Sequence, residues 1–151
     1  MGWGAVWSLV HVAMAVGWAA LFFLPRRPAI HSFILYAGVG ALCAAYLAMF
    51  VALFGGLADP VPVAGQGEPD LLNYSIGGVR SLFMSDGGTV LGWTHYLAFD
   101  LFVGLWISRD ADAKGFSRWA QAPVLFLTVM AGPIGLLTWL IVRERRARRG
   151  A

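Results

Sequence analysis

The sequence has few charged residues and a single cysteine. Only 13% of its 151 residues are Asp, Glu, Lys or Arg, whereas a soluble domain has about 25%. Hydrophobic residues make up 59% and the mean hydropathy is +0.70. This composition excludes an ordinary soluble domain and predicts a protein embedded in the lipid bilayer. The lone Cys43 cannot form an intramolecular disulfide, and we expect it to be a small packing residue.

The motifs of common soluble enzymes are also missing. The sequence contains no G-x-x-x-x-G-K phosphate loop, no H-E-x-x-H zinc motif and no G-x-S-x-G nucleophile motif. The net charge is +3, but five of the eleven basic residues lie between Arg143 and Arg149. A basic segment just beyond a membrane-spanning helix sets topology or contacts anionic headgroups. We therefore expect the lipid bilayer, and no nucleic acid, as its partner.

Four apolar segments predict membrane-spanning helices, each near the roughly 20 residues that a bilayer requires. They cover residues 3–24, 30–57, 91–107 and 122–142. One long loop joins the second and third, and its semi-apolar part, 71–85, predicts a short interfacial or capping helix. The sequence thus predicts an all-α integral membrane protein with one four-helix domain over residues 1–151. The first segment lacks a basic start and exceeds the length of a signal peptide core, so we expect it to remain as a span.

The fourth segment contains Gly132-Pro133-Ile134-Gly135 at its middle. Proline removes a helical hydrogen bond, so this motif predicts a kink inside the span. Four spans would place both termini on the same side of the membrane. The basic residues would then divide five against six between the two faces, which leaves the orientation open.

Asp100 is the only formally charged residue between Leu91 and Ile107. A carboxylate at mid-bilayer costs roughly 2.5 to 3.5 kcal/mol on insertion scales, so such residues usually face protein, water or a ligand. We interpret Asp100 as a candidate general acid, since a neutral carboxylic acid in an apolar cavity can donate a proton. A structural polar contact between helices is the alternative. His11 and Tyr96 are its predicted partners, whereas His95 lies about 140° away around the same helix.

Aromatic side chains and histidines supply further binding candidates. Trp7 and His11 share one face of the first span and would either stack on a ring-bearing ligand or pack against a neighbouring helix. Arg80 is the only cation of the long loop and predicts contact with a polar or anionic group. Three histidines on three helices permit a metal or haem in principle, but the sequence has no His-x-x-x-His pair. We predict no metal and no cofactor.

Two sequence blocks resemble a known family. They are Trp93–Gly104 (WTHYLAFDLFVG), extended by Trp106-Ile107 and Asp110-Ala111, and the later GPIGLL over 132–137. In these blocks the chain is similar to the abscisic-acid-deficient-four-like, or neoxanthin synthase-like, family, and the similarity covers nearly the whole chain. Plant members of that family are small four-helix plastid membrane proteins required to make neoxanthin from violaxanthin.

The resemblance implies a membrane protein that acts on or binds a carotenoid or related isoprenoid, with isomerase-type xanthophyll epoxide chemistry. It places catalysis near Asp100 and His95 and polyene contacts at Trp93 and Phe99. The further substrate-binding candidates are Tyr96, His11, Trp7 and Arg80. We expect no plastid transit peptide, and the richness in Ala, Gly and Arg favours a bacterial inner or photosynthetic membrane.

Two other functions compete with an enzyme. The first is a non-catalytic pigment-binding or assembly subunit of a larger membrane complex, or a homo-oligomer, which the aromatic content of 14% fits equally well. The second is proton conduction, in favour of which the sequence offers only Asp100, His11 and His95. We favour a carotenoid-related function over conduction and favour an enzyme over a binding subunit only slightly.

Overall fold

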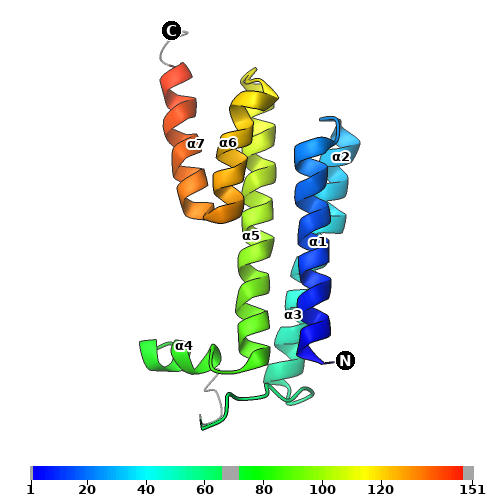
Figure 1. The fold of residues 1–151 in the computed structure, drawn as a ribbon, viewed down its shortest axis with the longest axis vertical. Helices are drawn as coiled ribbons and strands as arrows, with labels where there is room; N and C mark the ends of the chain where they lie inside the picture. Colours follow the sequence, from blue (N-terminus) through cyan, green and yellow to red (C-terminus); the bar gives the residue numbers. More distant parts are fainter. Residues whose placement is uncertain (1, 66–71, 148–151) are drawn as a thin grey trace.

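The computed structural model describes residues 2–65 and 72–147, and within them it contains helices and loops but no strand. The prediction of an all-α protein is confirmed. Three helices are long and apolar enough to cross a membrane, and they stand side by side in Figure 1. They are α1 (Trp3–Phe23), the continuous helix Pro28–Phe54, and α5 (Asp86–Ala113). The loop stretch 66–71 and the tail arginines Arg148 and Arg149 lie outside the described residues.

The second long helix has a wider turn near its middle. It consists of α2 (Pro28–Phe33), the π-helical segment η1 (Ile34–Gly40) and α3 (Ala41–Phe54). Gly38 lies in the π-helical segment, and a β-carbon added there would be 3.1 Å from Leu101 Cδ2 of α5. A β-carbon added at Gly17 of α1 would be 2.5 Å from the same Leu101 Cδ2 atom. Small residues thus let three helices converge on Leu101, which is fully buried.

The predicted fourth span, 122–142, is wrong. The chain instead forms two shorter helices, α6 (Arg118–Met130) and α7 (Gly132–Ala147), with 13 and 16 residues. At 1.5 Å per residue they reach about 20 and 24 Å, less than the roughly 30 Å hydrocarbon core. In Figure 1 they form a hairpin that enters the bundle from one end and turns back beside the middle of α5.

The local sequence explains how the chain can reverse at this point. Ala131 ends α6 with an extended backbone, φ −158° and ψ 86°. Pro133 then falls at the start of α7, where its missing N–H leaves no helical hydrogen bond unmade. Gly135 has no side chain and lies directly against Thr128 of α6, so the two helices approach closely. The proline that predicted a kink therefore starts a new helix.

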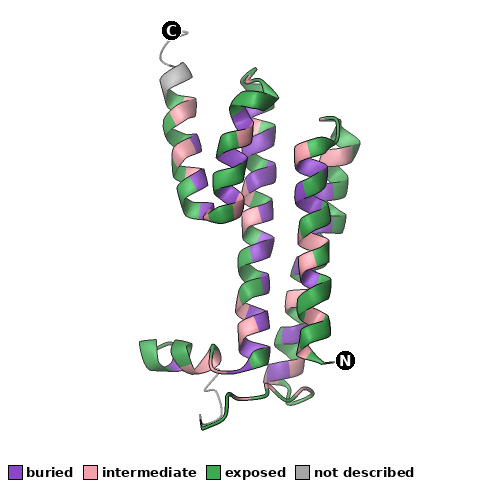
Figure 2. Ribbon diagram, in the orientation of Figure 1, coloured by how far each residue is buried: buried purple, intermediate pink, exposed green. Residues whose placement is uncertain are grey.

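The hairpin changes the topology. The start of α1 and the end of α7 lie at opposite ends of the bundle in Figure 1, so the prediction that both termini share a side is wrong. The end of α7 lies with the α1–α2 turn and the α5–α6 turn. Figure 2 shows buried residues concentrated where α5 meets its neighbours and exposed residues on the outer surfaces. Those outer surfaces are rich in exposed apolar side chains, as expected where a helix contacts lipid.

The long connection is anchored to the start of α5. Its backbone is held there by bonds from Val63 N–H to the Met84 carbonyl, 2.8 Å, and from Gly87 N–H to the Pro60 carbonyl, 2.9 Å. The buried Ser85 caps α5 by accepting from Gly88 N–H at 3.1 Å. The short helix predicted in this connection is present as α4 (Ile76–Leu82), which extends sideways from the start of α5, away from α1 and α3, in Figure 1.

Candidate functional site

Asp100 lies halfway along α5, where the tip of the α6–α7 hairpin meets it. A β-carbon added at Gly132, the first residue of α7, would overlap Asp100 Oδ1 and lie 2.8 Å from its Cγ. The side chain is half-buried. Within residues 2–65 and 72–147 it has no ion pair and no hydrogen bond to another residue. The carboxyl group thus sits beside Gly132, at the amino end of α7.

A second group of side chains joins α1 to α5. Trp93 Nε1 donates to His11 Nε2 at 3.1 Å, and His11 Nδ1 lies 2.8 Å from the Trp7 carbonyl oxygen. The indole N–H is only a donor, so His11 Nε2 accepts, and the Nδ1 proton is then placed to donate to the Trp7 carbonyl. These two bonds fix the imidazole ring. His11 contacts Trp93 and not Asp100, contrary to the predicted pairing.

Four rings form a continuous surface, which we call the aromatic face: Trp7, His11, Trp93 and Tyr96. The Trp7 and His11 ring centroids are 4.3 Å apart, and Trp7 stacks with Trp93 at 6.0 Å with an interplanar angle of 23°. Tyr96 adjoins Trp93 at 6.2 Å. Trp93 and Tyr96 are 43% and 56% exposed. The aromatic face is therefore accessible from outside the helix bundle.

The aromatic face leads to Asp100. Trp93, Tyr96 and Asp100 are spaced i, i+3, i+7, so they follow one side of α5. Seven residues of helix separate the ends of this row by about 10 Å. The site thus consists of an exposed aromatic surface with one carboxyl group at its end, against the hairpin tip.

His95 and Phe99 face another way. Their ring centroids are 4.6 Å apart, and His95 lies 5.8 Å from Tyr46 of α3. His95 therefore lies on the side of α5 that meets α3, in agreement with its predicted 140° separation from Asp100, and Phe99 packs against it. Arg80 is exposed on α4 at the end of the bundle. The structure therefore brings together Trp7, His11, Trp93 and Tyr96, with Asp100 further along the same side of α5. It does not bring His95, Phe99 or Arg80 to this group.

Two neighbours of the candidate residues were not predicted from the sequence. The sequence predicts Gly132 as part of a kink, whereas in the structure it forms the wall against Asp100. Tyr46 received no role, although its ring contacts His95. Within the described part of the chain, no group of three or more His, Cys, Asp or Glu side chains is arranged to hold a metal ion.

The fold and the site define a helical protein of the membrane type, with three helices long and apolar enough to cross a bilayer and a carboxyl group between a long helix and a helical hairpin. Residues 5–139 match the family model described as ABA DEFICIENT 4-like, and the chain belongs to this family. The resemblance seen in the Trp93–Gly104 and GPIGLL blocks is thereby confirmed. Neither the curated proteins nor the solved structures contained a match.

Proposed function

We propose that this protein binds a carotenoid or related isoprenoid in the membrane, along the aromatic face, and that Asp100 acts on it as a general acid. Family membership supports the carotenoid class. The observation that carries the proposal is the position of Asp100: a carboxyl group with no charged partner among the described residues, at the end of an exposed aromatic row. We place the protein in a bacterial inner or photosynthetic membrane on the basis of composition and resemblance.

The aromatic face suits a long conjugated ligand. Flat rings offer large apolar surfaces that stack at 4.5 to 7 Å centroid separation, roughly the spacing seen among these four rings. The Trp93–His11 bond holds two rings in place, so fewer rotamers need to be ordered when a ligand binds. A polyene lying along α5 from Trp93 would bring one of its ends to Asp100.

The chemistry that this arrangement supports is isomerisation of an epoxide. Asp100 in its neutral form donates a proton to the epoxide oxygen as the C–O bond breaks, and the resulting carboxylate accepts a proton from carbon as the new double bond forms. Asp100 donates one proton to oxygen and regains one from carbon, so the step is an isomerisation and needs no oxidant or reductant. The position of His95 on the α3 side gives no support to its predicted role beside Asp100.

A non-catalytic pigment-binding subunit is the second candidate. Its support is that the aromatic face is open and that Asp100 has no histidine or hydroxyl partner bonded to it among the described residues. In such a subunit, the same face would hold the pigment, and Asp100 would bond to a polar end group. An additional membrane protein, or a second copy of this chain, would then cover the outer surface of the pigment.

Turnover and binding measurements separate the two functions. The purified full-length protein in detergent is incubated with an epoxy-carotenoid, binding is followed by the absorption spectrum, and products are separated by chromatography. For an enzyme, we expect product from the wild type, and we expect Asp100→Asn to bind the carotenoid but form at least 100-fold less product, the usual scale of general acid catalysis. Stoichiometric binding without product would identify the pigment-binding subunit.

The matched control is Asp86→Asn, which makes the same change at an exposed position in the first turn of α5. This variant should behave as the wild type. A wild type that neither binds nor converts carotenoids would refute both candidates. Full activity in Asp100→Asn would be compatible with carotenoid binding but would refute the role of Asp100 as the general acid.

A further inference from the structure

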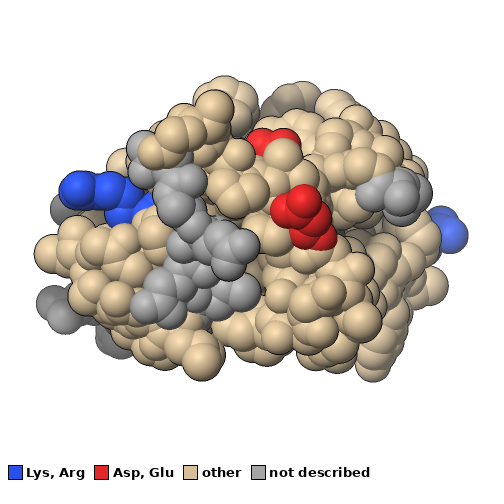
Figure 3. Space-filling view, turned by 90° about the horizontal axis from the view of Figure 1, so that it is seen from below, with Lys and Arg blue, Asp and Glu red and all other residues tan. Residues whose placement is uncertain are grey.

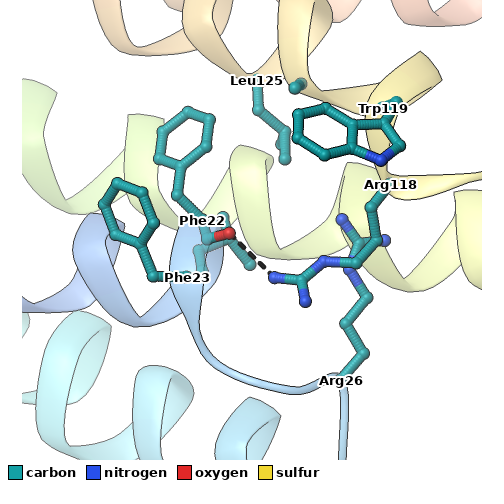
Figure 4. Close-up of a pocket in the computed structure, with 8 residues that line it drawn as sticks. Phe22, Phe23, Arg26, Arg118, Trp119 and Leu125 are labelled. Carbon is teal, nitrogen blue, oxygen red and sulfur yellow. Dashed lines mark hydrogen bonds between the residues drawn. The ribbon is translucent and has the colours of Figure 1, made fainter.

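A separate pocket lies at the other end of α1, away from the aromatic face. It has a volume of about 500 Å³ and opens between the end of α1 and the start of α6 (Figure 4). Its lining residues are Leu21, Phe22, Phe23, Arg26, Arg118, Trp119, Ala122 and Leu125. Six of these eight are apolar and two are arginines. Pockets of this size accommodate a substantial part of a small amphiphilic ligand.

The two arginines are held at one side of this pocket. Arg118 Nη2 donates to the carbonyl oxygens of Phe22 and Leu24 at 2.8 and 2.9 Å. Arg26 pairs with Asp112 and also bonds to Gln121, and its side chain is only 11% exposed. Figure 4 shows the phenylalanine rings on the opposite side from the arginines. The pocket therefore has a cationic side and an apolar side.

Donor groups on this cationic side remain unfilled. A guanidinium carries five N–H bonds, and the bonds of Arg118 within the described residues involve only Nη2. Arg26 Nε is buried and has no hydrogen-bond partner in the described part of the chain. This Arg26 atom is closed off, whereas the remaining donors of the exposed Arg118 can bond to a phosphate or carboxylate oxygen in the pocket.

The surrounding end of the bundle is strongly basic. Of the nine Lys and Arg residues with a described backbone, eight lie at this end: Arg26, Arg27, Arg109, Lys114, Arg118, Arg143, Arg145 and Arg146. Only Asp110, Asp112 and Glu144 oppose them. The other end, viewed in Figure 3, is mostly uncharged, with acidic groups near its centre. Basic ends of membrane proteins face the cytoplasmic leaflet, where anionic lipids are concentrated.

We propose that this pocket binds one anionic phospholipid, with its phosphate against Arg118 and Arg26 and an acyl chain against Phe22, Phe23 and Leu125. Trp119 is 88% exposed at the rim, and exposed tryptophan at a membrane interface lies at headgroup depth. Apolar walls alone would accept any lipid. Arg118, which has no carboxylate partner among the described residues, selects the anionic class, whereas the charge of Arg26 is already balanced by Asp112. This proposal is independent of the carotenoid function, since its residues and those of the aromatic face do not overlap.

Native mass spectrometry of the full-length protein in detergent tests the proposal with phosphatidylglycerol and phosphatidylcholine of identical chains. We expect tighter binding of phosphatidylglycerol. Arg118→Gln should weaken this binding about fivefold, the effect of losing one interfacial cation. The control is Arg27→Gln, an exposed arginine next to Arg26 in the α1–α2 turn that does not line the pocket. It should leave the affinity unchanged.

Thermal stability identifies variants that fail to fold. Because Arg118 also bonds to α1, Trp119→Ala provides a second test: it removes an exposed wall residue, and should weaken phosphatidylglycerol binding without lowering the melting temperature. Equal affinity for the two lipids, or an equal loss in Arg27→Gln and Arg118→Gln, would refute the proposal. Displacement of the lipid by glycerol phosphate would show a site for free phosphate. Displacement by a neutral carotene would show a polyene site. Either result would overturn the phospholipid proposal.

Discussion

Asp100 of α5 and Gly132 of α7 are in direct contact, although one is mid-helix and the other opens the second arm of a hairpin. The hairpin thereby supplies one wall around this acid. Only hydrogen occupies the position where any other residue would place its β-carbon. The geometry of the candidate acid therefore depends on glycine at position 132.

Replacing this glycine should disturb the hairpin. In Gly132→Ala, the added methyl group overlaps the Asp100 carboxyl group, and overpacking of this kind costs about 1 to 3 kcal/mol. We expect a lower melting temperature in detergent and reduced carotenoid conversion. The matched control is Gly4→Ala in α1, where an added β-carbon has no atom within 4 Å, so its melting temperature should not fall.

A double-mutant cycle assigns that loss to the carboxyl group. Asp100→Ala removes both the Cγ and the Oδ1 atoms that the added methyl group would overlap, so Gly132→Ala should be much less harmful in this background. If the alanine destabilises both backgrounds equally, its effect comes from the backbone at the helix break and not from Asp100.

The bond between Trp93 and His11 should hold the aromatic face together. Trp93→Phe keeps a ring for stacking but removes the N–H donor, leaving His11 Nε2 without its partner. A lost hydrogen bond of this type costs about 0.5 to 1.5 kcal/mol, so we expect carotenoid affinity to fall by roughly two- to tenfold. Absorption titration measures the affinity.

The control for this change is Trp106→Phe on the same helix. The Trp106 ring lies under the Arg143 guanidinium, 5.7 Å from its centroid, and phenylalanine keeps that contact in part. This variant should bind carotenoid as the wild type does. An equal loss in both variants would mean that indoles on α5 matter for general packing and that the His11 bond has no particular role.

Arg26 should be important for stability because it links three parts of the fold. Its guanidinium joins the α1–α2 turn to Asp112 at the end of α5 and to the buried Gln121 of α6. Arg26→Ala removes charge-assisted bonds worth about 1.5 to 3 kcal/mol, and we expect a clear fall in melting temperature. Arg27→Ala, next in sequence but exposed, should change it little; comparable losses would show that total charge in this turn governs stability.

Apolar run length was sufficient to predict the first three long helices, and the insertion cost of a carboxylate identified Asp100. The hairpin was not predictable in the same way. Gly132-Pro133 is compatible with either a kink or a reversal, and the contact between Gly135 and Thr128 that favours reversal exists only after folding. Likewise, His11 was placed on the correct face of α1, but its partner depended on which residue of α5 lay opposite. The packing of α1 against α5 determines which residue lies opposite His11, and no local sequence pattern predicts it.

The hairpin also predicts the orientation of the protein in the membrane. In a four-span topology the two faces would carry five and six basic residues, which gives no preference. With α7 turned back, eight described basic residues share one end and Arg80 alone marks the other. By the positive-inside tendency, the α1–α2 and α5–α6 turns should face the cytoplasm, and the start of α1 should face the opposite side.

Single cysteines introduced into a Cys43→Ala background test both the orientation and the hairpin, using a membrane-impermeant maleimide on intact cells. Ala64→Cys, in the long connection, should be labelled directly, whereas Lys114→Cys, in the α5–α6 turn, should be labelled only after permeabilisation. Glu144→Cys near the end of α7 discriminates between the topologies. With a re-entrant hairpin it behaves as Lys114→Cys does, because both lie at the same end of the bundle. If it behaves as Ala64→Cys does, the last two helices cross the membrane as a fourth span, and the contact between Asp100 and Gly132 could not be maintained by a hairpin tip.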